Sequence, residues 1–249
     1  MGVERKSLLY KSGLGFYCIN HVVGCAHGCL YPCYAFMMAK HYGRAHTYAE
    51  WCKPELVTNA EELLERELAR KRNRAGIACV HLSLTTDPFM HGHPEVHELS
   101  LRLIAKLNSH GLAASVLTKG VLPAELADRR RFGQENTYGI SIVSLDEGFR
   151  RRWEPGAAPY AERIAAARLL HDAGQRTLAH LEPYPTPNIV AQELDSILAA
   201  VAFVDEIYFS GWNYSSVVND YPDHERFYRQ ERARVHRFCR ARHIACVTD

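Results

Sequence analysis

The sequence predicts an α/β fold in which a parallel sheet curls into a partial (β/α)6 barrel. Short β-rich segments alternate with longer amphipathic segments along most of the chain. Each gap between expected strands is long enough for a helical crossover, which favours parallel pairing of neighbouring strands. Six such units with right-handed crossovers form an open barrel. The same pattern by itself also permits a flat, doubly wound sheet.

The expected strands are short apolar runs that lead into polar residues. They follow a polar, Gly-containing segment, residues 1–15, which we expect to be loosely held. The six strands and an optional seventh are expected at 15–23, 77–84, 113–118, 137–144, 176–181, 205–210 and 244–247.

The expected helices are segments in which apolar residues recur every three or four positions. The clearest runs from 93 to 109 and stops at Gly111, with a buried stripe of Val96, Leu99, Leu103, Ile104 and Leu107. The others are expected at 34–42, 56–72, 123–131, 160–173, 190–201 and 223–242.

The length of the chain indicates one barrel-sized domain or two small ones. From the order of elements we expect a single domain over residues 1–249, with a core barrel at about 16–210 and a helical cap at about 211–249. The chain has 249 residues, of which 47% are hydrophobic and 23% charged, as in ordinary globular proteins. Its formal net charge of +2 does not predict a nucleic-acid partner. No apolar run is long enough for a membrane span, and the first residues lack the apolar core of a signal peptide. We therefore expect a cytoplasmic protein without a membrane partner.

The most informative stretch is a cysteine motif at residues 24–35, directly after the first expected strand. Cys25, Cys29 and Cys33 stand at equal spacing, Cys-x3-Cys-x3-Cys. A [4Fe–4S] cluster normally takes four thiolates. Three thiolates would leave one iron open to a substrate or cosubstrate, so the motif indicates a chemical site.

Two other interpretations of the cysteines stay open. Zinc could be held by the three cysteines with His21 or His27 as the fourth ligand. The three thiols could also be unliganded. A disulfide scaffold is not expected, because eight cysteines are too few for a chain of this length. The other five, Cys18, Cys52, Cys79, Cys239 and Cys246, are expected to be buried or to line the barrel.

The stretch Gly-Cys-Ala-His-Gly-Cys-Leu-Tyr-Pro-Cys-Tyr-Ala resembles the cluster loop of radical SAM enzymes, in the branch that contains spore photoproduct lyase. That family usually has Cys-x3-Cys-x2-Cys, with an aromatic residue next to the third cysteine. Here Pro32 is inserted between Tyr31 and Cys33. Since proline fixes φ and removes a donor, the insertion is expected to reshape the last turn of the loop.

Polar residues follow each expected strand, where parallel α/β folds bind their ligands. Three of these strand ends resemble the same branch. Thr86-Asp87-Pro88-Phe89 resembles its Thr-Asp-Pro-aromatic motif, and Leu117-Thr118-Lys119 resembles the end of its third strand. The stretch from Ser141 through Glu154-Pro155-Gly156 resembles its fourth strand and the turn that follows.

The resemblance implies a set of cofactor contacts. Cys25, Cys29 and Cys33 would be the cluster ligands. Lys119 would bind the carboxylate of S-adenosylmethionine (SAM), Asp87 or Thr86 its amine, and Ser141 its ribose, with Glu154 and Thr85 in support. The aromatic residues Tyr31, Tyr34 and Phe36 would lie along the cluster and the adenine. Each of these polar residues could instead be an ordinary strand-end or turn residue.

Substrate contacts are expected near the sixth strand end. Trp212, Asn213 and Tyr214 would form a substrate wall, and Arg150, in the run Arg150–Arg152, could meet phosphates of a nucleic acid. Solvated helix faces are the default interpretation of the basic runs. The same default applies to the histidines His91, His93 and His97, which could otherwise hold a metal.

The resemblance implies a radical SAM enzyme. Its cluster, reduced by a flavodoxin- or ferredoxin-like donor, would cleave SAM to a 5′-deoxyadenosyl radical that takes hydrogen from a substrate. That substrate could be a nucleotide, a nucleic acid, a peptide or a small metabolite. Two rival classes remain: an electron-transfer or structural iron–sulfur protein, and a zinc-stabilised nucleic-acid-binding module.

Overall fold

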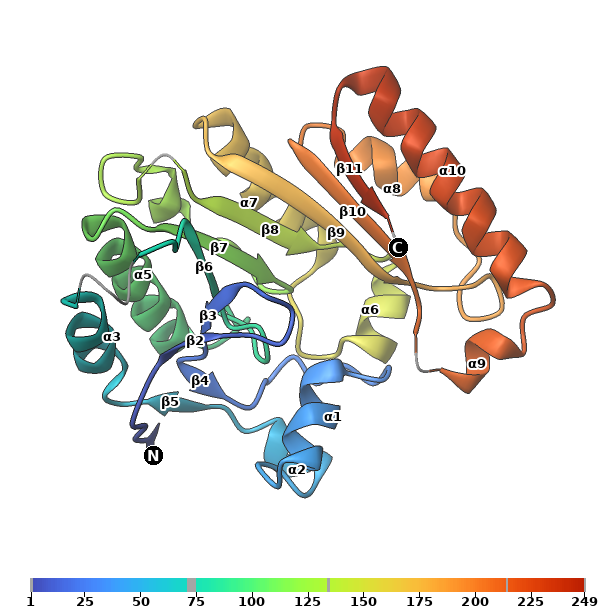
Figure 1. Ribbon diagram of the computed structural model, residues 1–249. Helices are drawn as coiled ribbons and strands as arrows, with labels where there is room; N and C mark the ends of the chain where they lie inside the picture. The colour runs from blue at the N-terminus through green and yellow to red at the C-terminus, as the bar shows by residue number, and fades with distance from the viewer. Residues whose placement is uncertain (1, 71–74, 134, 214, 249) are drawn as a thin grey trace.

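The computed structural model describes residues 2–70, 75–133, 135–213 and 215–248 (Figure 1). Its main sheet has eight strands in the order β11-β10-β9-β8-β7-β6-β3-β2. All neighbouring pairs are parallel except β2 and β3, which are antiparallel at one edge. The bounds are β2 Leu9–Lys11, β3 Tyr17–Ile19, β6 Cys79–Leu82, β7 Ala113–Thr118, β8 Thr137–Ser141, β9 Arg176–Tyr184, β10 Glu206–Gly211 and β11 Ala245–Thr248.

The strand order distinguishes between the two sheets that the sequence permits. From β3 to β11 the parallel strands follow chain order without reversal. A doubly wound sheet reverses its strand order at a switch point, whereas a barrel does not. The fold is therefore the expected partial barrel of parallel strands, left open between β11 and the β2–β3 edge.

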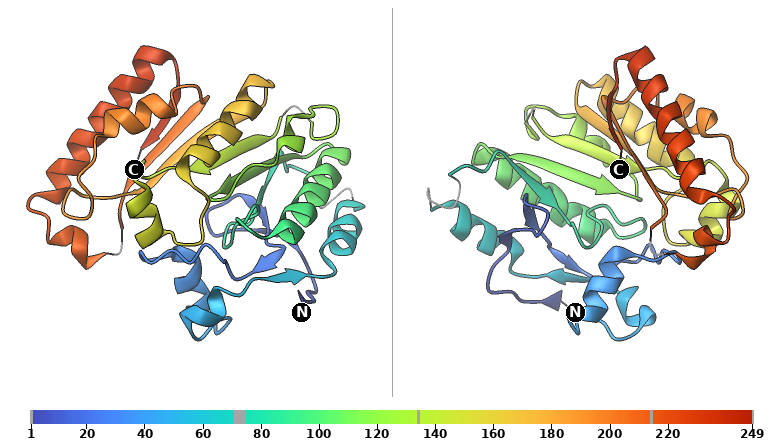
Figure 2. Two further views of the ribbon diagram at one scale, coloured as in Figure 1. Left: turned by 180° about the vertical axis from the view of Figure 1, so that it is seen from behind. Right: turned by 45° about the vertical axis from the view of Figure 1, so that its right-hand side comes forward.

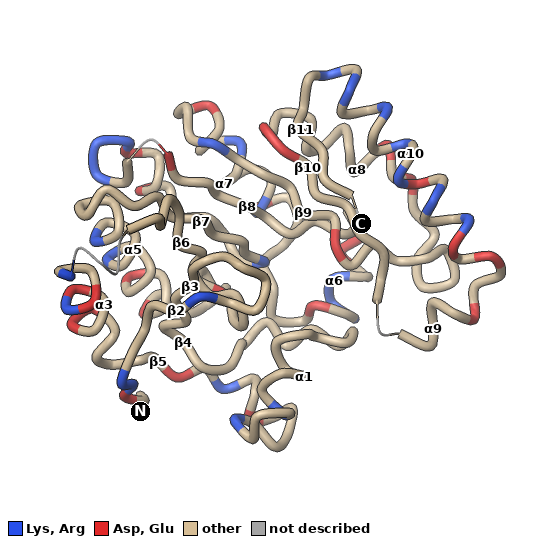
Figure 3. Tube along the Cα trace, in the orientation of Figure 1, with Lys and Arg blue, Asp and Glu red and all other residues tan. Residues whose placement is uncertain are grey.

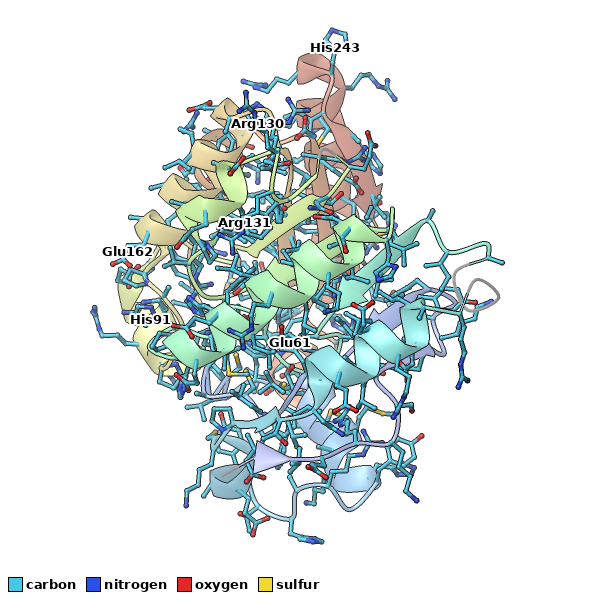
Figure 4. The ribbon with its side chains drawn as sticks, turned by 90° about the vertical axis from the view of Figure 1, so that its left-hand side faces the viewer. Glu61, His91, Arg130, Arg131, Glu162 and His243 are labelled. Atoms are coloured by element: carbon cyan, nitrogen blue, oxygen red, sulfur yellow. The ribbon has the colours of Figure 1, made fainter. Side chains whose placement is uncertain are left out.

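The helices cover the outer face of the sheet, as the view from behind shows (Figure 2). Helix α5, Pro94–Ser109, buries the stripe expected from its sequence. Beside it lies α3, Ala60–Leu68, joined to α5 by a 2.8 Å hydrogen bond from Arg102 to Glu61 (Figure 4). The other helices toward this face or the strand ends are the 3-10 helix Ala124–Ala127, α6 Glu147–Trp153, α7 Tyr160–Asp172 and α8 Leu194–Ala200.

A second, small sheet corrects two expectations. It joins β1 Gly2–Val3, β5 Glu55–Val57 and β4 Val22–Val23. Leu56 therefore lies in a strand, and the helix expected from 56 begins only at Ala60, because the chain first pairs with β1 and β4. The first residues are likewise not loosely held, since β1 and β2 both pair with other strands.

The C-terminal segment contains α9, Ser216–Asn219, and the long α10, His224–Arg242, before β11 extends the main sheet. The expected helical cap therefore also adds a strand to the sheet. Basic residues are spaced along α10 (Figure 3). Arg234 is paired with Asp195 and Glu231, as expected of a solvated helix face. A further basic run stands at residues 70–74 of the sequence, and residues 71–74 of it lie outside the described residues.

In the described part of the chain, none of the helices combines the length and the apolar character that crossing a bilayer requires.

Candidate active site

The cysteine loop, residues 24–33, runs from β4 to α1, Tyr34–His41, at the carboxyl ends of the barrel strands. Its three cysteines are free thiols of intermediate burial. The loop is fastened to α2, Tyr48–Trp51: the Cys25 amide donates to the Trp51 carbonyl at 2.9 Å, and the Tyr48 hydroxyl donates to the Cys29 carbonyl at 2.9 Å. These bonds fix both ends of the first Cys-x3-Cys segment.

Glu154 binds this loop to the barrel from within. Its side chain is fully buried, and Tyr31, inside the loop, donates its hydroxyl proton to Oε1 at 2.9 Å. The Lys119 ammonium lies 3.3 Å from the same oxygen, and Arg163 donates to Oε2 at 2.9 Å. Burial alone would raise the pKa of Glu154, but the two cations and the tyrosine outweigh it and lower that pKa to about 2. The carboxylate is charged and its two oxygens are both occupied.

Arg163 anchors that carboxylate and was not anticipated from the sequence. It is fully buried on α7, and its Nη1 and Nε donate to the carbonyls of Ser141 and Ala158 at 2.9 and 2.8 Å. A buried charge is tolerated when it is paired and hydrogen-bonded, as here. Arg163 therefore holds Glu154 against the end of β8. An arginine inside an otherwise amphipathic helix was the available signal in the sequence.

A second brace joins the loop to the end of β6. Asp87 accepts hydrogen bonds from the hydroxyl of Thr118 at 2.6 Å and the amides of Phe89 and Lys119 at 2.9 and 2.8 Å. The Nδ1 of His27, in the loop, lies 3.3 Å from Asp87, while its Nε2 accepts from the His91 amide at 3.0 Å. Burial raises the pKa of Asp87, but these partners outweigh it and lower that pKa to about 2.

These two braces revise the roles expected for Asp87 and Glu154. The Asp87 carboxylate is only 6% exposed and already accepts several hydrogen bonds, so it positions the loop and does not offer itself to an amine. Glu154 is likewise enclosed by protein donors, which occupy both of its oxygens. Both carboxylates act through the residues they hold.

The turn after α6 touches the cysteine loop directly. The Gly156 amide donates to the His27 carbonyl at 2.9 Å, and a Cβ at position 156 would lie 2.2 Å from the Ala26 carbonyl oxygen. No side chain fits in that space. The glycine of the Glu-Pro-Gly stretch is therefore required for close approach of two backbones, not only for a turn.

The remaining polar residues expected at the mouth lie at or directly after the ends of barrel strands. Lys119 keeps 15% of its side chain exposed, and its ammonium lies 5.7 Å from the centre of the Tyr31 ring. Ser141 ends β8, with its carbonyl held by Arg163. Thr85 and Thr86 follow β6, and the Oγ1 of Thr86 is buried without a hydrogen-bond partner among the described residues. An ammonium and hydroxyls thus border the loop with capacity for further hydrogen bonds.

The aromatic residues divide differently from expectation. Tyr31 is buried, and its ring lies 5.2 Å from that of Trp212, which also packs against Phe149 and Trp153 at 6.3 and 5.1 Å. Trp212 is only 3% exposed and packs against the cysteine loop through Tyr31, and together with Asn213 it also lines a cavity of about 480 Å³. Phe36 packs on Tyr48 and Trp51 in the contact of α1 with α2. Tyr34 is 47% exposed beside Cys33.

Of the other expected substrate residues, Arg150 is also engaged internally. Its Nη1 donates to the Ala157 carbonyl at 2.8 Å and its Nε to the carboxylate of Glu147, so it holds the turn after α6. Asn213 is exposed at the end of β10. Tyr214 lies outside the described residues.

The thiols fit an iron–sulfur cluster better than a zinc ion. Among the described residues, no three His, Cys, Asp or Glu side chains gather closely enough to hold one metal ion. A cluster does not need this, because each thiolate binds a different iron. His21 and His27 would have to leave existing partners to serve zinc: His21 bonds Ser100 and Ser83, and both ring nitrogens of His27 are occupied.

The histidines after β6 do not form a metal site either. Besides the contact of its amide with His27, His91 is exposed at the surface (Figure 4). His93 pairs with Glu95 at 2.9 Å, and His97 bonds the Met90 carbonyl at 2.8 Å. These contacts belong to the loop that leads into α5.

The family comparison matches the Radical SAM superfamily model to residues 19–201, which include the cysteine loop and the main-sheet strands β6 to β9. The chain belongs to the radical SAM superfamily. A curated relative, the uncharacterized protein ORF301 of Acidianus two-tailed virus, is 24% identical over 192 residues. The match covers 74% of this chain and 60% of that protein.

Solved radical SAM structures share the fold. Spore photoproduct lyase with bound AdoMet and a dinucleoside spore photoproduct superposes with a TM-score of 0.72 at 16% identity, covering 99% of this chain and 80% of that one. A radical SAM methyltransferase from Kitasatospora setae gives 0.50 at 17% identity, covering 77% and 35%. These likenesses confirm the expected fold.

The Gly156 contact makes a direct test of the radical SAM loop. Gly156→Ala places a methyl group against the Ala26 carbonyl, and neither backbone can move without breaking the bond from Gly156 to His27. We expect iron content after anaerobic reconstitution to fall by more than half, measured together with the melting temperature.

Gly13→Ala is the matched control, since a Cβ there meets nothing within 4 Å. If Gly156→Ala takes up as much iron as the parent protein, the turn does not position the loop.

Proposed function

We propose that this chain is a radical SAM enzyme in which Cys25, Cys29 and Cys33 hold a [4Fe–4S] cluster with one open iron. The observation that carries the proposal is the double bracing of a three-cysteine loop at the barrel mouth, by Glu154 on one side and Asp87 on the other. An electron-transfer protein needs neither a vacant ligand position nor a polar mouth beside it. The substrate is an organic molecule that gives up a hydrogen atom.

The residues around the loop support a SAM site beside the cluster. When bound, the reduced cluster and SAM supply a 5′-deoxyadenosyl radical by cleavage of the sulfonium C–S bond, with methionine as the other product. Lys119 is suited to bind the SAM carboxylate, because Glu154 Oε1 is its single ion-pair partner among the described residues and part of its side chain stays exposed. Thr86 and Ser141 offer hydroxyls on either side, for the amine and the ribose.

An external reductant has access to the loop. Leu30 is 56% exposed, and Pro32 and Tyr34 are exposed beside it, so the rim of the loop faces outward. A flavodoxin- or ferredoxin-like donor that docks there would lie close to the cluster. We therefore propose such a protein as the electron source.

Cysteine replacement tests the ligand set. Replacing Cys25, Cys29 or Cys33 with Ala should leave an incomplete cluster, with loss of the brown colour and of the electron paramagnetic resonance signal that shifts when SAM is added. Cys18→Ala and Cys52→Ala should keep both, since neither belongs to the motif. Retention of a SAM-responsive signal in a Cys25, Cys29 or Cys33 variant would rule that cysteine out as a ligand.

Replacing Lys119 tests the SAM site. A charged hydrogen bond contributes about 1.5–3 kcal/mol, so Lys119→Ala should weaken SAM binding about tenfold or more. The cluster should persist, because Arg163 and Tyr31 still hold Glu154. The measurement is a SAM titration of the reconstituted variant, with Lys106→Ala, which removes an ammonium on the outer face of α5, as control. Unchanged SAM affinity would remove Lys119 from the site.

Replacing Trp212 tests whether its ring lines the substrate or supports the cysteine loop. Because Trp212 packs on Tyr31, we expect Trp212→Ala to lower substrate turnover and uncoupled SAM cleavage together. Uncoupled cleavage is measured as 5′-deoxyadenosine formed without substrate. If Trp212→Ala lowers turnover alone, the ring lines the substrate after all.

A further inference from the structure

A cavity of about 600 Å³ borders the cysteine loop. Its lining comes from the N-terminal segment, the residues before Cys25, helix α1 and the residues that follow β6. Gly24 precedes the first cysteine of the motif and Tyr34 follows the last, so the cavity borders the loop itself. Its volume lies in the range of about 300–1,000 Å³ that ligand pockets have.

The charge of this cavity is one-sided. Arg5, Lys6 and Arg44 line it, and no aspartate or glutamate does. None of these three cations takes part in an ion pair within the described part of the chain. This differs from the surroundings of Glu154, where Lys119 and Arg163 share its carboxylate.

Arg5 is held in place even though it has no acidic partner. Its backbone exchanges hydrogen bonds with the Asn59 side chain at 3.1 and 2.9 Å, and its Nη1 donates to the Asn20 carbonyl at 3.0 Å. Burial and the nearby Arg44 both lower the pKa of Arg5, so an anion between the two guanidinium groups would relieve a cost already present. Guanidinium groups bind phosphate through paired hydrogen bonds, which a carboxylate-free cavity leaves available.

The remaining lining suits an aromatic ring. Tyr10, Tyr34 and Tyr42 and the flexible Met38 line the same cavity, and Tyr34 and Tyr42 are largely exposed. Tyrosine and methionine provide flat, polarizable surfaces against which rings pack. Thr85 and Thr86 also line the cavity, so it adjoins the proposed SAM site.

We propose that this cavity binds an aromatic phosphate ester, with its phosphate between Arg5 and Arg44 and its ring against the tyrosines. The proposal rests on the proposed function only in making this ligand the substrate, because the cavity adjoins the loop that would hold the cluster. Free nucleotides and the ends of nucleic-acid strands share this chemistry.

Isothermal titration of the reconstituted protein with uridine monophosphate, in the presence of saturating SAM, tests the binding. Saturating SAM keeps the nucleotide out of the adenosyl site. We expect uridine monophosphate to bind at least tenfold more tightly than uridine or inorganic phosphate, and its affinity to fall as salt is raised. Binding no tighter than that of uridine would overturn the proposal.

Variants locate the site. Arg5→Gln and Arg44→Gln should each weaken uridine monophosphate binding at least tenfold. Arg237→Gln, an exposed cation of α10, should not change it. Since Arg5 also supports the fold, the exposed Arg44 provides the decisive variant. Unchanged affinity in Arg44→Gln, or an equal loss in Arg237→Gln, would overturn the assignment of the cavity.

Two further measurements are needed. One distinguishes a free nucleotide from the end of a nucleic-acid strand, and the other tests the cavity separately from the proposed function. A 5′-phosphorylated oligouridylate that binds more tightly than the mononucleotide identifies a strand end as the natural form, and the reverse identifies a free nucleotide. Binding is also measured in Cys25→Ala, where it should persist without a cluster. If SAM is never cleaved but uridine monophosphate binding still depends on Arg44, the proposed function is wrong and the assignment of the cavity is supported. If SAM is cleaved but uridine monophosphate binding does not depend on Arg44, the proposed function is supported and the assignment of the cavity is wrong.

Discussion

The buried carboxylate of Glu154 is the constraint on which the mouth of the barrel depends. Tyr31 from the cysteine loop, Lys119 from the end of β7 and Arg163 from α7 all converge on its two oxygens. Each partner satisfies a charge that would otherwise be buried alone, and removing one partner of such a set typically costs about 3–5 kcal/mol. The cysteine loop, the end of β7 and α7 therefore cannot shift independently. The cysteines are held in position as well, because Tyr31 lies in their loop.

The elements that the sequence predicts well are those with enough residues to show a period. Helix α5 and strand β7 fall where the pattern places them, because apolar positions in each bury one continuous face. The two- and three-residue strands β1, β4 and β5 have no period to detect, and their pairing joins segments far apart in sequence, such as Gly2 with Leu56 and Val22 with Leu56. That pairing moved Leu56 from an expected helix into a strand. Long-range partners, not local propensity, decided those segments.

The sequence predicts where the residues of the candidate site lie better than it predicts what each of them does. The motif locates the cysteine loop, and strand-end polarity locates Lys119, Ser141 and the Thr-Asp-Pro stretch. Whether a carboxylate faces a ligand or the protein depends on donors that lie far away in sequence, such as Tyr31, which is 123 residues from Glu154. The carboxylates of Glu154 and Asp87 are bound by such protein donors, which the sequence pattern does not reveal. Trp212 is buried because Tyr31, Phe149 and Trp153 form a niche that fits its ring.

Charge is distributed unequally about the cysteine loop, and the two sides serve different ends. On the side of Lys119, the carboxylates of Glu154 and Asp87 each accept hydrogen bonds from protein donors. Their charge therefore serves to hold the cysteine loop in position. Along the cavity, the described lining residues around Arg5 and Arg44 include no aspartate or glutamate, and burial and the nearby Arg44 both lower the pKa of Arg5. A fold that tolerates uncompensated cations next to a rigid loop gains nothing in stability from them. Their physical use is in binding, where an anion recovers the energy and its position is fixed relative to the cysteines.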